Sequence, residues 1–182
     1  MRPLRVVVTG SECTGKTTLA RALAERFGAP WVPEYARGYC EAKPAPLGPE
    51  DVEPIARGQV AEADAAESRA TDLLVLDTDL LSTVVYARHY YGAAPPWVEA
   101  AARARRGDLY LLCAPDLPWT ADGVRDRGEV RQEMHRLFAE ELARARVDVV
   151  HVAGSGPERA EAAIAAVARA VGGRSPAGRP RG

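Results

Sequence analysis

Residues 10–17 read Gly-Ser-Glu-Cys-Thr-Gly-Lys-Thr, and the apolar run Leu-Arg-Val-Val-Val-Thr at residues 4–9 comes directly before them. The stretch fits the pattern GxxxxGK[ST]. The segment LARALAERF, which follows from Leu19, has the periodicity of an amphipathic helix. A strand, a glycine-rich loop and a helix in this order form the context in which the pattern binds phosphate. The sequence therefore predicts a phosphate loop at residues 10–17.

Each part of this loop has a physical role in the prediction. The two glycines let backbone N–H groups converge on a β-phosphate at the positive end of the following helix. The ammonium of Lys16 can reach the β- and γ-phosphate oxygens, and the hydroxyl of Thr17 can ligate Mg²⁺. We therefore expect ATP and Mg²⁺ as cofactors. The loop residues expected to bind the nucleotide are Gly10, Ser11, Glu12, Cys13, Thr14, Gly15, Lys16, Thr17 and Thr18.

Short apolar runs alternate with longer stretches of helical periodicity along the rest of the chain. Apolar runs without internal alternation predict buried strands of a parallel sheet that has helices on both faces. The expected fold class is α/β, a three-layer P-loop NTPase fold with a five-stranded parallel sheet and a small lid segment. Strands are predicted at Leu4–Thr9, near Pro30–Pro33, and at Leu73–Asp77, Leu109–Cys113 and Val147–Val152; helices are predicted at Lys16–Phe27, about Pro49–Ala70, Ser82–Tyr91, Pro96–Arg106, Val130–Arg146 and Pro157–Val171.

Length and composition limit the classes of protein to consider. A chain of 182 residues with 47% apolar and 27% charged residues suits one soluble globular domain. The net charge of −1 argues against a broad nucleic-acid or membrane surface. We expect a kinase domain over residues 1–171, with a proline-rich loop at Ala42–Pro49 and a disordered basic tail over residues 172–182.

The cysteines and the N-terminus bear on the compartment. The three cysteines are widely spaced and form no CxxC pair, which fits a reducing compartment. No apolar run approaches the ~18 residues typical of a membrane span, and the N-terminus leads directly into a strand and the phosphate loop. We expect a cytoplasmic location, a small-molecule substrate, and neither a membrane nor a nucleic-acid partner.

Acidic residues fall at the predicted carboxyl ends of strands, where ligands of such sheets bind. Asp77 closes the run LLVL, so Thr17 and Asp77 are the predicted metal ligands, and Lys16 and Asp77 are predicted to act in catalysis. The carboxylate that orients or deprotonates an acceptor hydroxyl is either Glu34 or Asp79, and the sequence does not choose between them. For Asp79 the alternative is an N-cap of the next helix.

A polar, glycine-punctuated segment, APDLPWTADGVRDRGEVRQ, spans residues 114–132 after the fourth strand. Arginines here can close over the phosphates and neutralise charge that develops on the transferred group. The alternative is that they are solvated charges paired with neighbouring acids. We expect a lid in which Arg125 acts in catalysis and Arg125 and Arg127 bind the nucleotide, with Arg131 close to them.

Aromatic residues are few but lie near predicted strand ends or loops. An aromatic face beside a carboxylate suits a flat, cationic ring, through stacking and cation–π attraction. Some of these residues should pack in the core or at its rim, and others suit an acceptor site. The residues concerned are Trp31, Tyr35, Tyr39, Trp97 and Trp119.

Four segments, GSECTGKTTL, VPEYARGY, VLDTD and PWTADGVRDRG, resemble in the same order those of the ribosylnicotinamide kinase domain of NadR-type proteins. The resemblance covers residues 4–152, and the last three segments are more specific than the phosphate loop alone. It implies an enzyme that transfers the γ-phosphate of ATP to the ribose 5′-hydroxyl of nicotinamide riboside. The product is nicotinamide mononucleotide, and the reaction is a step of NAD biosynthesis.

The resemblance also implies which residues meet the acceptor. They are Glu34, Tyr35, Arg37, Asp79, Trp119 and Asp122.

NadR proteins carry an adenylyltransferase domain with a His-x-Gly-His-type motif, and no histidine of this chain stands in one. The sequence also shows no helix-turn-helix repressor segment, so we expect neither adenylyl transfer nor repression here. The alternatives left open are a kinase for another nucleoside or small metabolite, and a non-catalytic ATP-binding regulator.

Overall fold

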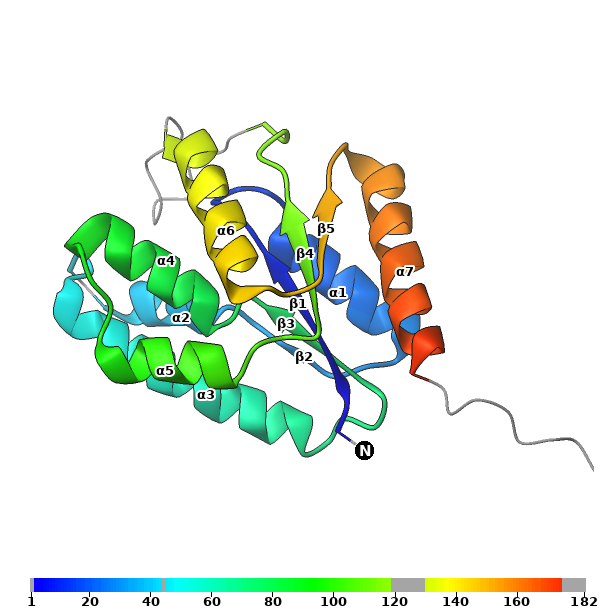
Figure 1. The fold of residues 1–182 in the computed structure, drawn as a ribbon, viewed down its shortest axis with the longest axis horizontal. Helices are drawn as coiled ribbons and strands as arrows, with labels where there is room; N and C mark the ends of the chain where they lie inside the picture. Colours follow the sequence, from blue (N-terminus) through cyan, green and yellow to red (C-terminus); the bar gives the residue numbers. More distant parts are fainter. Residues whose placement is uncertain (1, 44, 119–129, 175–182) are drawn as a thin grey trace, which may run out of the picture.

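The centre of the fold is a five-stranded sheet in which every neighbouring pair of strands is parallel (Figure 1). The computed structural model describes residues 2–43, 45–118 and 130–174. The strand order is β2-β3-β1-β4-β5, so the strand that leads into the phosphate loop lies in the middle. The predicted α/β fold class is confirmed. The strands are β1 (Leu4–Thr9), β2 (Trp31–Val32), β3 (Leu73–Asp77), β4 (Leu109–Cys113) and β5 (Val149–Val152).

Helices cover both faces of the sheet and make the three layers. Helices α1 and α7 pack on one face, and α3, α4, α5 and α6 pack on the other (Figure 1). Alternate side chains of β1 supply both faces, since Val6 and Val8 enter one core cluster and Val7 enters the other. The helices are α1 (Lys16–Phe27), α2 (Tyr35–Ala42), α3 (Val52–Glu67, after a 3₁₀ turn at Pro49–Asp51), α4 (Leu80–Tyr91), α5 (Pro96–Ala104), α6 (Arg131–Ala145) and α7 (Gly156–Gly173).

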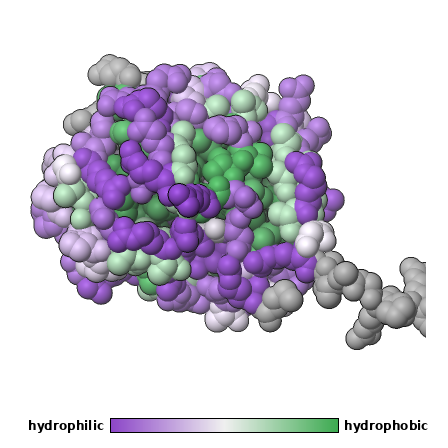
Figure 2. All heavy atoms as spheres, viewed as in Figure 1, coloured by the Kyte–Doolittle hydropathy of each residue, from purple (hydrophilic) through white to green (hydrophobic). Residues whose placement is uncertain are grey.

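The structure corrects the sequence prediction at three elements. Helix α2 was not predicted, and it begins inside the EYAR segment. Strand β5 is not a buried strand, since three of its four residues are partly or largely exposed. In Figure 2 apolar side chains are visible over β5, between α6 and α7. Helix α7 continues to Gly173, past the predicted boundary at residue 171. None of the helices in the described part of the chain is long and apolar enough to span a bilayer.

Candidate active site

The phosphate loop connects β1 to α1 at the carboxyl end of the sheet. Gly10 has φ 137°, and a Cβ there would lie 2.8 Å from the carbonyl oxygen of Cys113, so only glycine lets β4 approach this closely. Gly15, the N-cap of α1, is left-handed with φ 76°. Lys16 is 5% exposed, and its Nζ donates to the carbonyl of Ser11 at 2.8 Å. The loop is therefore preformed around a buried cation.

The two predicted metal ligands meet at the edge of this loop. The Thr17 hydroxyl donates to Oδ2 of Asp77 at 2.5 Å, and Asp77 is only 1% exposed. Mg²⁺ prefers oxygen ligands and takes only one or two from the protein when a substrate phosphate supplies others. A hydroxyl and a carboxylate that converge beside a phosphate loop fit that requirement. Among the described residues there is no cluster of three or more His, Cys, Asp or Glu that would hold a metal by itself.

A pocket of about 460 Å³ adjoins the phosphate loop, and it is the best candidate for an acceptor site. Glu12 of the loop, Glu34 before α2 and Asp51 before α3 line it, as do side chains from one face of α4. The described lining includes no Lys, Arg or His. The lining residues are Glu12, Glu34, Ala36, Cys40, Pro46, Leu47, Gly48, Asp51, Val52, Ile55, Gln59, Thr78, Ser82, Thr83, Tyr86, Ala87, Tyr90 and Tyr91.

Of the two carboxylates considered for the acceptor, the structure brings only Glu34 to this pocket. Asp79 is the N-cap of α4, because its Oδ1 accepts from the backbone N–H of Leu81 at 3.0 Å. Its Oδ2 accepts from the Tyr110 hydroxyl at 2.6 Å. Burial raises the pKa of the Asp79 carboxyl, against the opposing effect of these donors. The geometry thus favours the capping alternative for Asp79.

The tyrosines of α4 were missed as acceptor candidates. Tyr86 and Tyr90 stack with their ring centroids 6.1 Å apart and their planes 8° apart, and both line the pocket. Their spacing of four residues puts them on one helix face with Thr83, which lies three residues before Tyr86. That spacing was the available signal, because it places a polar and aromatic stripe directly after the DTD segment.

The other predicted acceptor residues either do not line this pocket or lie outside the described residues. The ring of Tyr35 lies against Gly58 of α3, and neither Tyr35 nor Arg37 lines the pocket. Trp31 packs with the α1 side of the sheet, under the guanidinium of Arg21 at 5.2 Å, so it does not serve the pocket. Trp97 stacks with Arg57 at 4.6 Å and also lies outside the pocket lining. Trp119, Asp122, Arg125 and Arg127 of the predicted lid lie outside the described residues, whereas Arg131 at its end begins α6 and is buried.

A short strap, residues 45–51, forms one wall of the pocket. Asp51 holds it, accepting from the backbone N–H of Gly48 at 2.7 Å, from Lys43 Nζ at 2.5 Å and from the Tyr39 hydroxyl at 2.9 Å. The Lys43 ammonium, followed by the Gly48 N–H, lowers the pKa of the Asp51 carboxyl. Tyr91 donates to the carbonyl of Leu47 at 3.0 Å. The strap is therefore held to the fold at Leu47 and Asp51.

Thr78 has a strained backbone, and it lies between Asp77, the predicted metal ligand, and Asp79, the N-cap of α4. Its φ is 69°, a left-handed conformation that is a genuine outlier for a β-branched residue. The backbone N–H of Thr78 donates to the carbonyl of Val8 at 2.9 Å, which fixes the turn to β1. Thr78 is 5% exposed and lines the pocket. Such strain at a pocket commonly accompanies function, since the surrounding structure must overcome it.

We expect Thr78→Gly to leave the free energy of unfolding unchanged or to raise it by about 1 kcal/mol. Relief of the left-handed strain is worth about 1–2 kcal/mol, and the extra freedom of glycine in the unfolded chain offsets part of that. The matched control is Thr83→Gly, in the helical backbone of α4, which should lower stability by about 0.5–1 kcal/mol. Chemical denaturation measures both. A loss at Thr78 as large as that at Thr83 would contradict the assignment of strain.

A parallel sheet of this order, with a GxxxxGK[ST] loop after its central strand, defines a P-loop nucleotide-binding protein. The sequence model of the AAA domain family matches residues 5–159, and the chain belongs to that family. The trifunctional NAD biosynthesis/regulator proteins NadR of Salmonella typhimurium and Escherichia coli are each 32% identical to it over 153 residues. That alignment covers 81% of this chain and 37% of each NadR, so the chain spans little more than a third of these relatives.

Solved structures agree with this resemblance. A crystal structure of NadR in complex with NR has a TM-score of 0.80 and 30% identity, over 93% of this chain and 51% of that one. NadR in complex with NAD and AMP-PNP has a TM-score of 0.76 and 30% identity, over 93% and 50%. A thymidylate kinase from Ehrlichia chaffeensis, at 12% identity and a TM-score of 0.65, shares the fold alone. The predicted resemblance to NadR is confirmed.

Proposed function

We propose that this protein is a Mg-dependent kinase that transfers the γ-phosphate of ATP to the ribose 5′-hydroxyl of nicotinamide riboside. The product is nicotinamide mononucleotide. The observation that carries the proposal is the acidic, aromatic pocket that adjoins the phosphate loop. The relatives support it, since one NadR structure contains NR, which we interpret as nicotinamide riboside, and another contains the ATP analogue AMP-PNP.

The chemistry of phosphoryl transfer requires positioning and charge neutralisation more than covalent steps. On the donor side, the N–H groups of the phosphate loop and the ammonium of Lys16 bind the phosphates. Thr17 and Asp77 hold Mg²⁺, which when bound neutralises charge on the β- and γ-phosphates. Thus Lys16 and Thr17, which follow β1, and Asp77, which ends β3, prepare the γ-phosphate for attack.

On the acceptor side, Glu34 orients the attacking hydroxyl and accepts its proton. The argument rests on place, because Glu34 lines the same pocket as Glu12 of the phosphate loop. An acceptor in this pocket therefore has the donor phosphate at one end. The apolar and aromatic side chains of α4 provide the surface on which a flat base lies.

The charge of the pocket favours a cationic base over a neutral one. Glu12, Glu34 and Asp51 line the pocket, and no cationic side chain stands among the described lining residues. Asp51 forms an ion pair with Lys43, so the charge argument rests on Glu12 and Glu34. A pyridinium ring gains on the order of 1 kcal/mol from each nearby carboxylate or aromatic face at partly exposed sites. A neutral base keeps the stacking but loses the charge attraction. We therefore expect the pocket to select for the positive charge of nicotinamide.

The test compares kcat/KM for nicotinamide riboside, adenosine, cytidine and uridine at saturating Mg-ATP. We expect nicotinamide riboside to exceed each of the others by about tenfold or more, since 1.4 kcal/mol corresponds to that factor. The reduced dihydronicotinamide riboside is the matched control, because its ring has a similar shape but no charge. Equal efficiency with adenosine would rule out the assigned acceptor and leave the phosphotransferase assignment standing. ATP turnover that does not depend on any acceptor would favour the alternative of an ATP-binding regulator.

A further inference from the structure

Two buried arginines, Arg131 and Arg159, lie behind the phosphate loop and outside the pocket lining. Arg131 comes from the end of the predicted lid segment, whereas no sequence motif singled out Arg159. Arg159 of α7 is 5% exposed and Arg131 of α6 is 8% exposed. A buried guanidinium is costly unless its N–H groups are hydrogen-bonded, so its partners show what it stabilises. For both arginines these partners include backbone carbonyls of the phosphate loop.

Arg159 joins four segments of the chain at one point. Its Nη2 donates to the carbonyl of Thr14 in the phosphate loop at 2.8 Å and to that of Ala114 at 3.2 Å. Its Nη1 donates to the carbonyl of Gly154 at 2.8 Å and to Oδ1 of Asp116, also at 2.8 Å. The loop, the ends of β4 and β5 and the start of α7 thereby share one cation.

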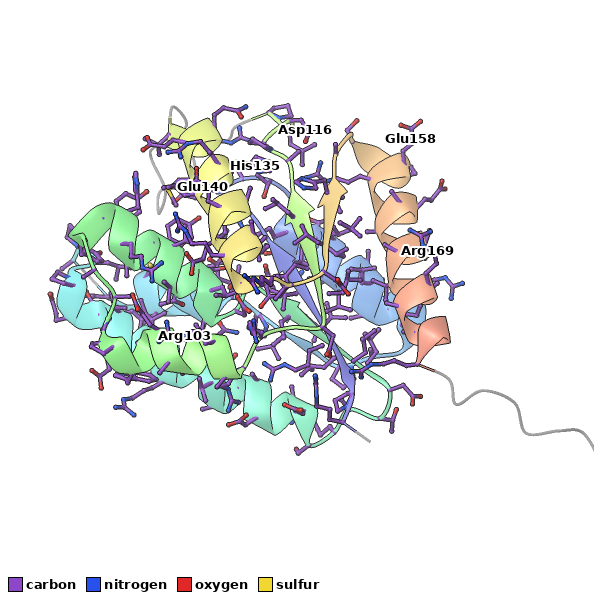
Figure 3. All side chains as sticks on the ribbon, in the orientation of Figure 1. Arg103, Asp116, His135, Glu140, Glu158 and Arg169 are labelled. Carbon is purple, nitrogen blue, oxygen red and sulfur yellow. The ribbon has the colours of Figure 1, made fainter. Side chains whose placement is uncertain are left out.

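Asp116 completes this arrangement. Its second oxygen, Oδ2, accepts from the backbone N–H of Gly154 at 2.6 Å, so the carboxylate holds both Arg159 and the turn before α7. Burial alone would raise the pKa of Asp116, but the Gly154 N–H and the Arg159 guanidinium hold it below its usual value. Figure 3 shows Asp116 beyond the end of β4, at the end of the molecule where α7 begins. The carboxylate thus keeps the guanidinium in place.

The contact with Thr14 bears on phosphate binding through the geometry of the peptide unit. A trans peptide is planar, so its C=O and N–H point in opposite directions. Because Arg159 holds the carbonyl of Thr14, the N–H of Gly15 faces away from Arg159. Arg131 acts similarly one residue earlier, since its Nη2 donates to the carbonyl of Cys13 at 3.3 Å.

The backbone of the loop needs such support. Cys13 and Gly15 have φ values of 52° and 76°, and left-handed residues within a loop make a concave nest of N–H groups that binds anions. A left-handed conformation at Cys13 is not the one its side chain prefers. Hydrogen bonds to the carbonyls on the outer side of the loop therefore hold the N–H groups in their anion-binding orientation.

We propose that Arg159, held by Asp116, is a positioning residue that preorganises the phosphate loop for the triphosphate of ATP. It touches no substrate and acts through the Thr14–Gly15 peptide. The proposal rests on the proposed binding of ATP by this loop. It predicts that loss of the guanidinium weakens nucleotide binding and leaves the acceptor pocket unchanged, since Arg159 is not among the residues that line that pocket.

The test is binding of Mg-AMP-PNP without acceptor, measured by calorimetry on the unchanged protein, Arg159→Met and Arg159→Lys. We expect Kd to rise about tenfold or more in R159M, and less in R159K, which keeps the charge and some donors. The matched control is Arg169→Met, because Arg169 is an exposed arginine further along α7 (Figure 3). Its Kd should stay within about twofold of that of the unchanged protein, as for most surface substitutions.

Steady-state kinetics provide the second readout. In R159M the KM for ATP should rise while the KM for the acceptor stays constant, a split that a merely structural role would not produce. A folded R159M with an unchanged Kd for AMP-PNP and lowered thermal stability would overturn this inference and leave the proposed function standing. Failure of the unchanged protein to bind AMP-PNP would overturn the proposed function as well. If R159M does not fold, the Kd for Mg-AMP-PNP and the KM for ATP of R159K test the inference in the same way.

Discussion

Lys16→Ala is expected to lower kcat by at least about 1,000-fold while the fold survives. The lysine provides the only ammonium within the phosphate loop, and its Nζ is held beside the loop by the carbonyl of Ser11. Removal of a single preorganised donor to a developing negative charge costs about 100- to 1,000-fold in related chemistry, and a full positive charge contributes more. The measurement is coupled ADP release at saturating ATP and acceptor.

The fold should tolerate this change because Lys16 makes a local contact with its own loop rather than a link between layers. Thermal unfolding followed by circular dichroism checks that point. Arg26→Ala is the matched control, since Arg26 is an exposed cation near the other end of the same helix. That variant should keep the turnover of the unchanged protein. Near-normal turnover in a folded Lys16→Ala would show that the phosphate loop is not the active site.

The parts of the site that the sequence predicted are local in the chain. The phosphate loop is one continuous motif, and Asp77 is recognisable because it ends a short apolar run typical of a buried strand. The meeting of Thr17 and Asp77 follows from the parallel pairing of β1 with β3, which brings two strand ends together. Topology and motif together were therefore enough to predict that Thr17 and Asp77 meet beside the phosphate loop.

The parts that were missed depend on contacts distant in the sequence or on weak local signals. Helix α2 has only eight residues, buries none of them and contains Gly38, a poor helix former, so its signal in the sequence is weak. Strand β2 has two residues, too few for alternation to show which face Trp31 takes. Arg159 contacts Thr14 across 145 positions of sequence, and no motif connects the two.

The assignment of the acceptor pocket rests on a third kind of information, the directions of neighbouring side chains. Glu34 and Asp79 were equivalent in sequence, since each follows a predicted strand. The structure distinguishes them, because Asp79 caps the helix that begins at Leu80 and also accepts from the Tyr110 hydroxyl. Those contacts leave Glu34 as the carboxylate that can meet an acceptor hydroxyl.

Glu34→Gln is accordingly expected to lower kcat by about 100-fold or more, the usual contribution of a general base. The amide keeps the size of the side chain and can still accept a hydrogen bond, but it cannot take a proton from the hydroxyl. Binding of Mg-AMP-PNP should not change, because the nucleotide contacts of the phosphate loop remain. The KM for nicotinamide riboside should rise by only about fivefold, which corresponds to the ~1 kcal/mol that one carboxylate contributes to a cationic ring.

Glu41→Gln is the matched control for this substitution, since Glu41 lies on the same short helix with its side chain exposed. It should leave kcat and both KM values unchanged. Single-turnover measurements at saturating acceptor isolate the chemical step from product release. A loss in Glu34→Gln confined to the KM of the acceptor, with an unchanged single-turnover rate, would assign Glu34 to binding alone. The proton would then have to leave through another group in the pocket, for which Glu12 is the neighbouring carboxylate.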